Sequence, residues 1–377
     1  MNTVPFRFGK IVTGDYFVNR LADIERLKTN FSFGVNTVII SPRRWGKSSL
    51  VAKVKESLSE DKSLIICDLD LFNIRSEEDF YIAYANAVMS ASASKWEEIA
   101  ALSKAFLSKL LPQITLTADN QTPLTFGVAW EDVGENADAI LNLAESVALK
   151  KKKRIVVCFD EFQNIATFAE PLAFQKKLRA HFQVHQNVTY CFYGSKRHMM
   201  LDVFTDASMP FYKFGDLMFL DKISETEWEK YIVHSFAETG RTISESRARA
   251  IALRVENHPY YVQQLSQQVW FRTQSAVTEA IIEQAHEDLI SQLSLLFVSL
   301  TENLPTSQVE FLRAMLNNET QLTSQKTLKK YKIGTSANVS RAKNALIQKD
   351  IIDEVNAGLY FQDPIYKEWL KRNYFKM

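Results

Sequence analysis

The sequence predicts an α/β protein whose parallel sheet carries helices on both faces, followed by an all-helical domain and a small third domain. Three patterns point to this class. Short β-branched runs alternate with longer helical patterns through the first half of the chain, as in successive β-α-β units. Sheet-type runs stop near Ile223, and amphipathic helical patterns follow. The last part of the chain combines three helical patterns with two short strands.

The composition is that of a folded globular protein. Hydrophobic residues make up 46% of the 377 residues and charged residues 24%, while 11 Gly and 9 Pro are too few for a disordered or collagen-like chain. The 45 Lys and Arg residues balance the 44 Asp and Glu residues, so binding of nucleic acid or anionic lipid must be local. The three cysteines lie in apolar runs, which is typical of reduced core thiols. Because no run approaches the roughly 18–20 residues of a membrane span, we expect a cytoplasmic protein without membrane contact.

Predicted helices connect the predicted strands of the first domain, residues 1–222. The strands cover residues 37–41, 64–69, 155–160 and 188–194. The helices begin near Lys47, Ser76, Asn136 and Leu172. Residues 112–130 interrupt this series, because polar and apolar residues alternate there about a turn-rich segment, and they predict an inserted hairpin.

Two further domains are predicted after the sheet, over residues 223–300 and 301–377. The first contains three or four amphipathic helices, with candidates over residues 224–238, 244–256, 259–275 and 279–296. The second begins with turn and helix-cap residues, then shows three helices and two short strands around Asn356–Gly358. Three helices followed by a hairpin indicate a winged helix.

A glycine-lysine-serine motif lies between the first strand and the first helix. Residues 37–51 (TVIISPRRWGKSSLV) have the arrangement of a phosphate-binding P-loop, in which backbone N–H groups and a helix N-terminus surround the β-phosphate. Gly46, Lys47 and Ser48 supply the close backbone approach, the cation for the β- and γ-phosphates and the hydroxyl for Mg²⁺. We place Ser49 near the α-phosphate. These residues predict a nucleotide site.

The first glycine expected of such a loop is replaced by Ser41. Pro42 follows, and a residue before proline is pushed toward an extended conformation, where a side chain costs little. We therefore include Pro42, Arg43, Arg44 and Trp45 among the nucleotide-binding residues. Arg43 and Arg44 either contact phosphate or a neighbouring subunit, or face solvent.

Two carboxylates follow the third predicted strand. Residues 155–164 (IVVCFDEFQN) place Asp160 and Glu161 at the strand's carboxyl end, the edge of a parallel sheet at which ligands bind. Asp160 would hold Mg²⁺ directly or through a water, and Glu161 would polarise the water that attacks the γ-phosphate. Alone, such a pair is more often a solvated strand end, but a P-loop earlier in the chain favours the catalytic interpretation.

The fourth predicted strand ends in Tyr-Gly-Ser. Ser195 at this tip would lie beside the γ-phosphate and the attacking water, which makes it the third predicted catalytic residue with Lys47 and Glu161. An ordinary Gly-Ser turn explains the same residues equally well.

Together these motifs resemble the AAA-type ATPases of archaea and bacteria that are related to the STAND NTPases. The resemblance covers nearly the whole chain and rests on the segments YFVNR, SPRRWGKSSL, FDEFQ, YGS and NHPYYV. It implies an ATPase core, a helical lid and a C-terminal winged helix. It also implies that a segment with Phe17, Asn19 and Arg20 closes over the adenine together with the lid residues Pro259 and Tyr260.

The adenine contacts have an alternative explanation within the lid. Asn257 stands where STAND-like lids have glycine, and Pro259 is also suited to start a helix, with Tyr260 in the lid core. Lys213 lies where a basic residue often follows the sensor strand, so no arginine that acts on a neighbouring subunit is assigned there. The chain has no Asn-Lys-x-Asp motif for guanine, which favours ATP and ADP as ligands.

Two other groups of residues are assigned structural roles. The basic run Lys150–Arg154 lies between a predicted helix end and a strand, where cations complement the helix dipole. His181 and His185 share a helical face, but Phe182 stands where a metalloprotease helix needs glutamate, so a metal site is disfavoured.

The sequence thus predicts a Mg²⁺-dependent ATPase that acts as a slow nucleotide switch. The alternative is a nucleotide-regulated DNA-binding or protein-interaction regulator with little hydrolysis, including a scaffold that uses nucleotide to form oligomers. The third helix of the winged helix would present Ser336, Ser340, Arg341 and Asn344, in a domain with a modest excess of basic residues. Duplex DNA and a protein partner both remain open for this surface.

Overall fold

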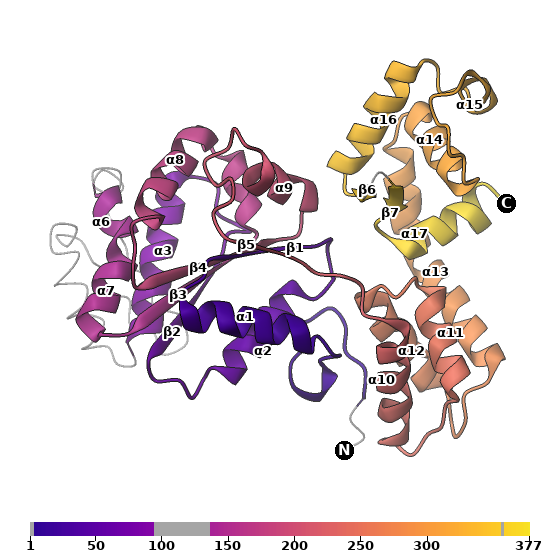
Figure 1. Ribbon diagram of the computed structural model, residues 1–377. Coiled ribbons are helices and arrows are strands. Elements are labelled where there is room, and N and C mark those ends of the chain that lie inside the picture. The colour runs from indigo at the N-terminus through magenta and orange to yellow at the C-terminus, as the bar shows by residue number, and fades with distance from the viewer. Residues whose placement is uncertain (1–3, 94–135, 356–357) are drawn as a thin grey trace. The chain divides into compact units, whose positions relative to one another are not determined.

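The computed structural model describes residues 4–93, 136–355 and 358–377 (Figure 1). The hairpin predicted at residues 112–130 lies outside these ranges. The chain divides into two compact units. Residues Arg20–Asp221 form the first, here called the sheet unit, and residues Met1–Asn19 with Lys222–Met377 form the second, here called the helical unit.

The sheet unit contains five parallel strands in the order β2-β3-β4-β1-β5. They are β1 (Thr37–Ile40), β2 (Leu64–Asp70), β3 (Arg154–Asp160), β4 (Val188–Gly194) and β5 (Asp216–Phe219). This arrangement confirms the predicted parallel sheet. The sequence patterns did not predict β5, whose four residues (DLMF) include no β-branched residue, unlike the four of β1 (TVII).

Helices cover both faces of this sheet, as predicted. They are α1 (Leu21–Phe33), α2 (Lys47–Ser57), α3 (Glu77–Ser92), α6 (Ala137–Leu141), α7 (Leu143–Lys151), α8 (Pro171–Phe182), α9 (Arg197–Thr205) and the short 3-10 helix η3 (Phe162–Thr167). Figure 1 shows α1 and α2 on one face and α3, α7 and α8 on the other. Local signals set several helix starts: the Ser76 hydroxyl accepts from the Asp79 N–H at 3.1 Å, and Pro171 occupies the first turn of α8.

Aromatic side chains fill the space between the sheet and α3, α8 and η3. Phe159 on β3 stacks on Phe192 of β4 with ring centroids 5.5 Å apart, and Phe162 of η3 lies 4.5 Å from Phe192. All three are fully buried. This core ends directly beneath the carboxyl end of β3, so it holds the backbone there in a fixed position.

After residue 221 the helical unit contains four helices in the region where three or four were predicted, here called the lid helices. They are α10 (Glu225–Ala237), α11 (Glu245–Arg254), α12 (Pro259–Arg272) and α13 (Glu279–Glu302). The N-terminal segment packs on them: Phe6 is fully buried against Phe236, and its carbonyl accepts from Gln267 Nε2 at 2.8 Å. The first 19 residues therefore group with the lid helices, whereas the sequence assigned them to the sheet domain.

The winged-helix elements follow in the predicted order. They are α14 (Thr306–Leu316), α15 (Gln325–Tyr331), α16 (Ser336–Gln348), β6 (Ile352–Val355), β7 (Gly358–Phe361), α17 (Pro364–Trp369) and the single turn η4 (Leu370–Tyr374). Strands β6 and β7 pair antiparallel. The sequence pattern did not predict α17.

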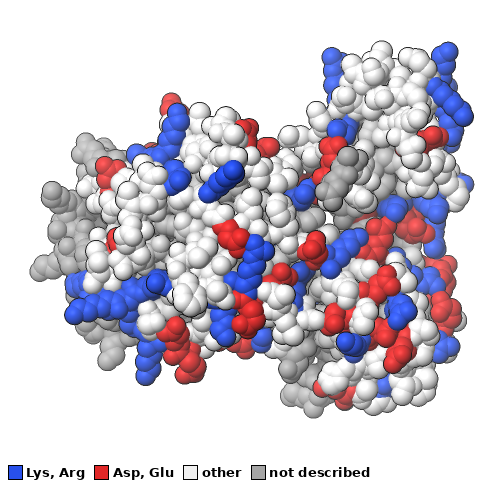
Figure 2. All heavy atoms as spheres, viewed as in Figure 1, with Lys and Arg blue, Asp and Glu red and all other residues white. Residues whose placement is uncertain are grey.

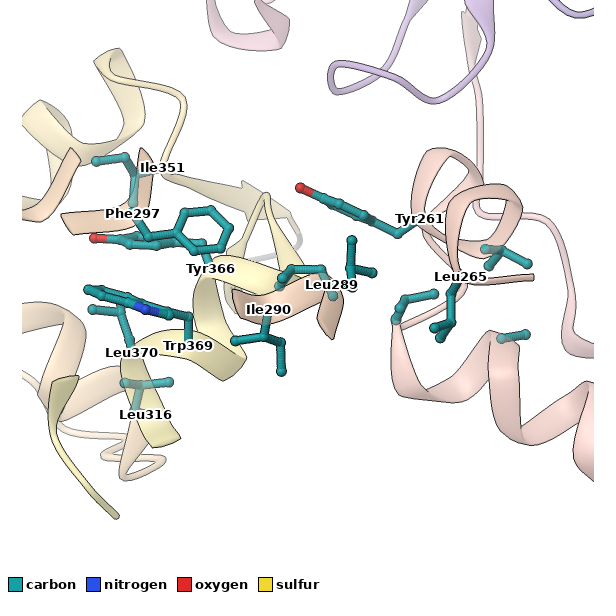
Figure 3. Packing of buried hydrophobic residues seen from close by; sticks show 14 of the residues in the cluster. Tyr261, Leu265, Leu289, Ile290, Phe297, Leu316, Ile351, Tyr366, Trp369 and Leu370 are labelled. Carbon is teal, nitrogen blue, oxygen red and sulfur yellow. The ribbon is translucent and has the colours of Figure 1, made fainter. Parts of the chain in front are cut away.

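Lid and winged helix share one hydrophobic core within the helical unit. Figure 3 shows Phe297 of α13 next to Tyr366 and Trp369 of α17, while Leu289 of α13 lies toward α12. The Tyr261 hydroxyl of α12 also donates to Asp363 Oδ2 at 2.6 Å. Helix α13 is thus common to both predicted domains.

None of the helices within the described ranges combines the length and apolar character needed to cross a bilayer.

Candidate functional site

The loop between β1 and α2 has the backbone of a tight anion-binding turn. Gly46, at the N-cap of α2, has φ of 93°, and Arg44 also lies in the left-handed region with φ of 62°. A side chain is strained at such a φ, which explains glycine at position 46. The loop leads directly into the N-terminus of α2, whose N–H groups and dipole favour a bound anion.

The side chain of Lys47 lies inside this loop and hydrogen-bonds its backbone. Its side chain is only 6% exposed, and its Nζ donates to the carbonyls of Ser41 at 2.9 Å and Pro42 at 2.8 Å and to Ser41 Oγ at 3.2 Å. Burial lowers the pKa of Lys47 to about 8, against the opposing effect of Glu161 and Asp160. Ser41 thus supplies an acceptor that the glycine usual at this position lacks.

Ser48 and Asp160 meet at the neighbouring edge of the sheet. The Ser48 hydroxyl on α2 donates to Asp160 Oδ2 at the end of β3, over 2.9 Å. The pKa of Asp160 is raised to about 6, chiefly by burial and also by the nearby Glu161 charge, against the opposing effect of the Ser48 hydrogen bond. The two predicted metal ligands, far apart in the sequence, are therefore neighbours in space.

Glu161 is held by donors from two other positions. Its Oε2 accepts from Ser195 Oγ at 2.8 Å, from the Ser195 N–H at 3.3 Å and from Gln163 Nε2. Glu161 itself has φ of 52°, in the left-handed region. Such a conformation is costly for a residue other than glycine, and its occurrence at the tip of β3 is typical of functional sites.

Arg20 supports the loop from behind. Its side chain is buried, and its Nη2 donates to the carbonyls of Trp45 and Asp221, each at 3.1 Å, while Nη1 pairs with Asp23. Burial lowers the pKa of Arg20, which the contacts with Asp23 oppose. The guanidinium therefore stabilises the P-loop backbone, a role the sequence did not indicate.

The other predicted adenine contacts belong to the helical unit. Phe17 and Asn19 lie in the N-terminal segment. Pro259 is buried in the first turn of α12, and Tyr260 packs edge-on against Phe8 with ring centroids 5.5 Å apart. These contacts agree with a packing role in the lid, and the adenine contact stays a prediction.

The remaining loop residues differ in exposure. Arg43 and Arg44 are exposed, while Pro42, Trp45 and Ser49 are half-buried.

Outside the loop, His181 contacts Asn142 and Asp138, and His185 contacts Asn142 and Tyr190. These contacts account for both histidines without a ligand.

Gln163 is the site residue to which sequence analysis assigned no role. One feature of the sequence points to Gln163. It is a polar residue between Phe162 and Ile165, in a segment whose buried positions are otherwise apolar. Its partner Glu161 is only two residues away, but the contact depends on the turn of η3 and on the position of β4.

The comparisons with known proteins agree with this architecture. A family described as "Probable winged helix domain" matches residues 295–372. The Walker-type ATPase PABY2304 of Pyrococcus abyssi has a similar structure, with a TM-score of 0.67 and 14% sequence identity, over 97% of this chain and 99% of that one. The ORC2 protein of Aeropyrum pernix, solved in ADPNP-ADP complexes, is similar with a TM-score of 0.54 and 11% identity, over 96% of this chain and 94% of that one. No curated protein sequence matches the chain.

At 14% and 11% sequence identity, the structural similarity shows only that the folds are alike. The parallel sheet, the helices α10–α13 and the matched C-terminal segment all agree with it. The chain therefore has the fold of the AAA-type P-loop ATPases and carries a winged-helix domain at its C-terminal end.

Proposed function

We propose that the protein binds ATP at the P-loop and hydrolyses it slowly to ADP and phosphate in the presence of Mg²⁺. One observation carries the proposal. The carboxyl ends of three adjacent strands, β3, β4 and β1, bring together Asp160 and Glu161, Ser195, and the loop with Lys47 and Ser48. These side chains provide the phosphate cation, the metal ligands and the water-activating group that phosphoryl transfer requires.

Nucleotide binding follows from the loop and from Lys47. The N-terminus of α2 offers backbone N–H groups to an anion, and the Lys47 ammonium would exchange its contacts with Ser41 and Pro42 for phosphate oxygens. The fold of an ATPase from P. abyssi and of a protein solved with ADPNP and ADP supports a nucleotide as the ligand.

The residues at the loop fit a magnesium ion. Hydroxyl and carboxylate oxygens are the kinds of ligand that Mg²⁺ takes at phosphate sites. Ser48 Oγ and Asp160 Oδ2 are separated by 2.9 Å. Bound Mg²⁺ would neutralise charge on the phosphates. Asp160, half-buried beside Glu161, would gain a cation that favours its charged form.

Glu161 and Ser195 account for hydrolysis and for the nucleotide switch. The Glu161 carboxylate would orient and deprotonate the attacking water. Ser195 Oγ donates to that carboxylate here, and a γ-phosphate oxygen would compete for the same proton. Because only contacts that differ between ATP and ADP can shift a conformational equilibrium, Ser195 is the group through which we propose that the protein distinguishes them.

The test is steady-state phosphate release from ATP with Mg²⁺, with EDTA, and with added duplex DNA. We expect Mg²⁺-dependent release at less than about 1 s⁻¹, below the usual range of enzymes. ATP binding without release would instead favour the alternative, a nucleotide-regulated binding protein. No binding of ATP would contradict the assignment of the P-loop.

We propose that the winged helix binds a partner, either duplex DNA or a protein, in a way that depends on the bound nucleotide. Ser336, Ser340, Arg341 and Asn344 on α16 are all exposed. Figure 2 shows basic side chains on the part of the view that holds α15 and α16. Lys343 on the same helix pairs with Glu354 of β6 at 3.0 Å, so part of this positive charge is already neutralised.

A further inference from the structure

Gln163 is a buried carboxamide in the first turn after β3. Its side chain is 1% exposed, and its Nε2 donates to Glu161 Oε2. The same carboxylate oxygen accepts two hydrogen bonds from Ser195. Three donors from two strand ends thus converge on one oxygen of the group assigned to activate water.

The residue opposite Gln163 makes room for its amide. A Cβ atom at Gly194, the last residue of β4, would overlap Gln163 Oε1 and lie 3.0 Å from Met200 Sδ. The backbone of Gly194 is outside the left-handed region, so glycine is required there for space and not for conformation. The end of β4 is therefore shaped around the Gln163 side chain.

Packing alone does not favour an amide at this position. Gln163 Oε1 is buried without a hydrogen-bond partner among the described residues. An apolar side chain of the same length would avoid the desolvation of this oxygen. The amide is thus retained at a cost to stability, and its hydrogen bond to Glu161 is the contact that an apolar side chain could not make.

We propose that Gln163 is a positioning residue that sets the orientation of the Glu161 carboxylate for ATP hydrolysis, with Gly194 providing the space. The inference rests on the proposed function. Because the Gln163 amide fixes one carboxylate oxygen together with Ser195, the orientation of the other oxygen is fixed as well. Loss of the amide should lower kcat. The affinity for ATP should stay unchanged, because the hydrogen bond of Gln163 goes to Glu161 and not to the P-loop.

The test compares Gln163→Met with Gln175→Met. Gln175 on α8 is also 1% exposed with an unpartnered Oε1 among the described residues, but it has no contact with Glu161, so it is a matched control for the loss of a buried amide. We expect Gln163→Met to lower kcat about tenfold or more, with the Kd of a non-hydrolysable ATP analogue within about twofold of the parent. Gln175→Met should leave both values unchanged.

Gly194→Ala provides a second test that keeps the amide but displaces it. Its kcat should fall by a similar factor, and the combination with Gln163→Met should cost no more than the larger single effect, because both changes act on one amide. Multiplying effects would overturn the inference, as would a parental kcat in Gln163→Met. If Gln163→Met does not fold, Gln163→Leu, which also removes the N–H donor without adding a charge, takes its place with the same expected result. Absence of Mg²⁺-dependent hydrolysis in the parent protein would overturn the proposed function itself.

Discussion

The carboxyl edge of the sheet and the exposed face of α16 both present polar residues, but they are built differently. At the sheet edge, Lys47 is buried, and Ser48, Asp160 and Glu161 each hydrogen-bond a residue from another element. On α16 the corresponding side chains are exposed, and Lys343 is engaged by Glu354. A partly buried, mutually bonded set of residues specifies one chemistry, whereas an exposed polar face specifies only shape and charge.

This difference determines how substitutions should act. At the sheet edge each group has a separate role in one reaction, so single changes should have large and distinct effects. On the winged helix, binding is a sum of screened surface contacts, so single changes should have small and similar effects. The following predictions test this contrast, from the largest expected effect to the smallest.

Glu161→Gln should lower kcat by about two to four orders of magnitude while ATP still binds, because the amide cannot take a proton from water. Phosphate release and calorimetric ATP binding measure the two properties. Glu170→Gln, an exposed change at the start of α8, is the matched control and should leave both unchanged. Parental turnover in Glu161→Gln would assign Glu161 a structural role.

Lys47→Ala should raise the Kd of ATP about tenfold to a hundredfold, since a hydrogen bond to a charged group contributes about 1.5–3 kcal/mol. Lys53→Ala, two turns further along α2 where Lys53 pairs with Glu56, is the control and should bind ATP like the parent. Equal affinity of the parent and Lys47→Ala in calorimetry would remove the P-loop from the binding site.

Pro259→Ala and Tyr260→Ala test whether the lid contacts adenine. If it does, the Kd values of ATP and ADP should rise together, by about tenfold for loss of one stacked ring, because both nucleotides carry the base. The melting temperature of the nucleotide-free protein should stay nearly unchanged. The opposite pattern, an earlier melting transition with unaltered affinity, would leave both residues with the packing role that their contacts with the lid suggest.

Arg341→Ala should weaken binding to duplex DNA severalfold and reduce the salt slope by about one unit, as for one phosphate contact. Lys343→Ala should have a smaller effect, because Lys343 must first leave its ion pair with Glu354. Fluorescence titrations at several salt concentrations measure both. A parent protein that does not bind DNA at low salt would leave a protein as the proposed partner of this surface.

Local sequence patterns determined much of this protein. The P-loop was predictable because a strand, a glycine-lysine-serine motif and a helix follow one another within 15 residues, so the structure depends on neighbours in the chain. The winged-helix elements were predictable for the same reason, since each has its own apolar period. The patterns did not predict β5, α1, α9 or α17, although α1 is a 13-residue helix.

The tertiary structure decided which of these residues act together. Asp160 meets Ser48 across 112 positions in the chain, and Glu161 meets Ser195 across 34, because β3, β4 and β1 lie side by side in the sheet. No local period encodes that strand order. The Trp45 carbonyl bound by Arg20, the space that Gly194 leaves for Gln163, and the grouping of the first 19 residues with the lid also depend on packing between distant segments. Such contacts depend on which distant segments come together in the fold. The residue pattern of a single segment does not encode this.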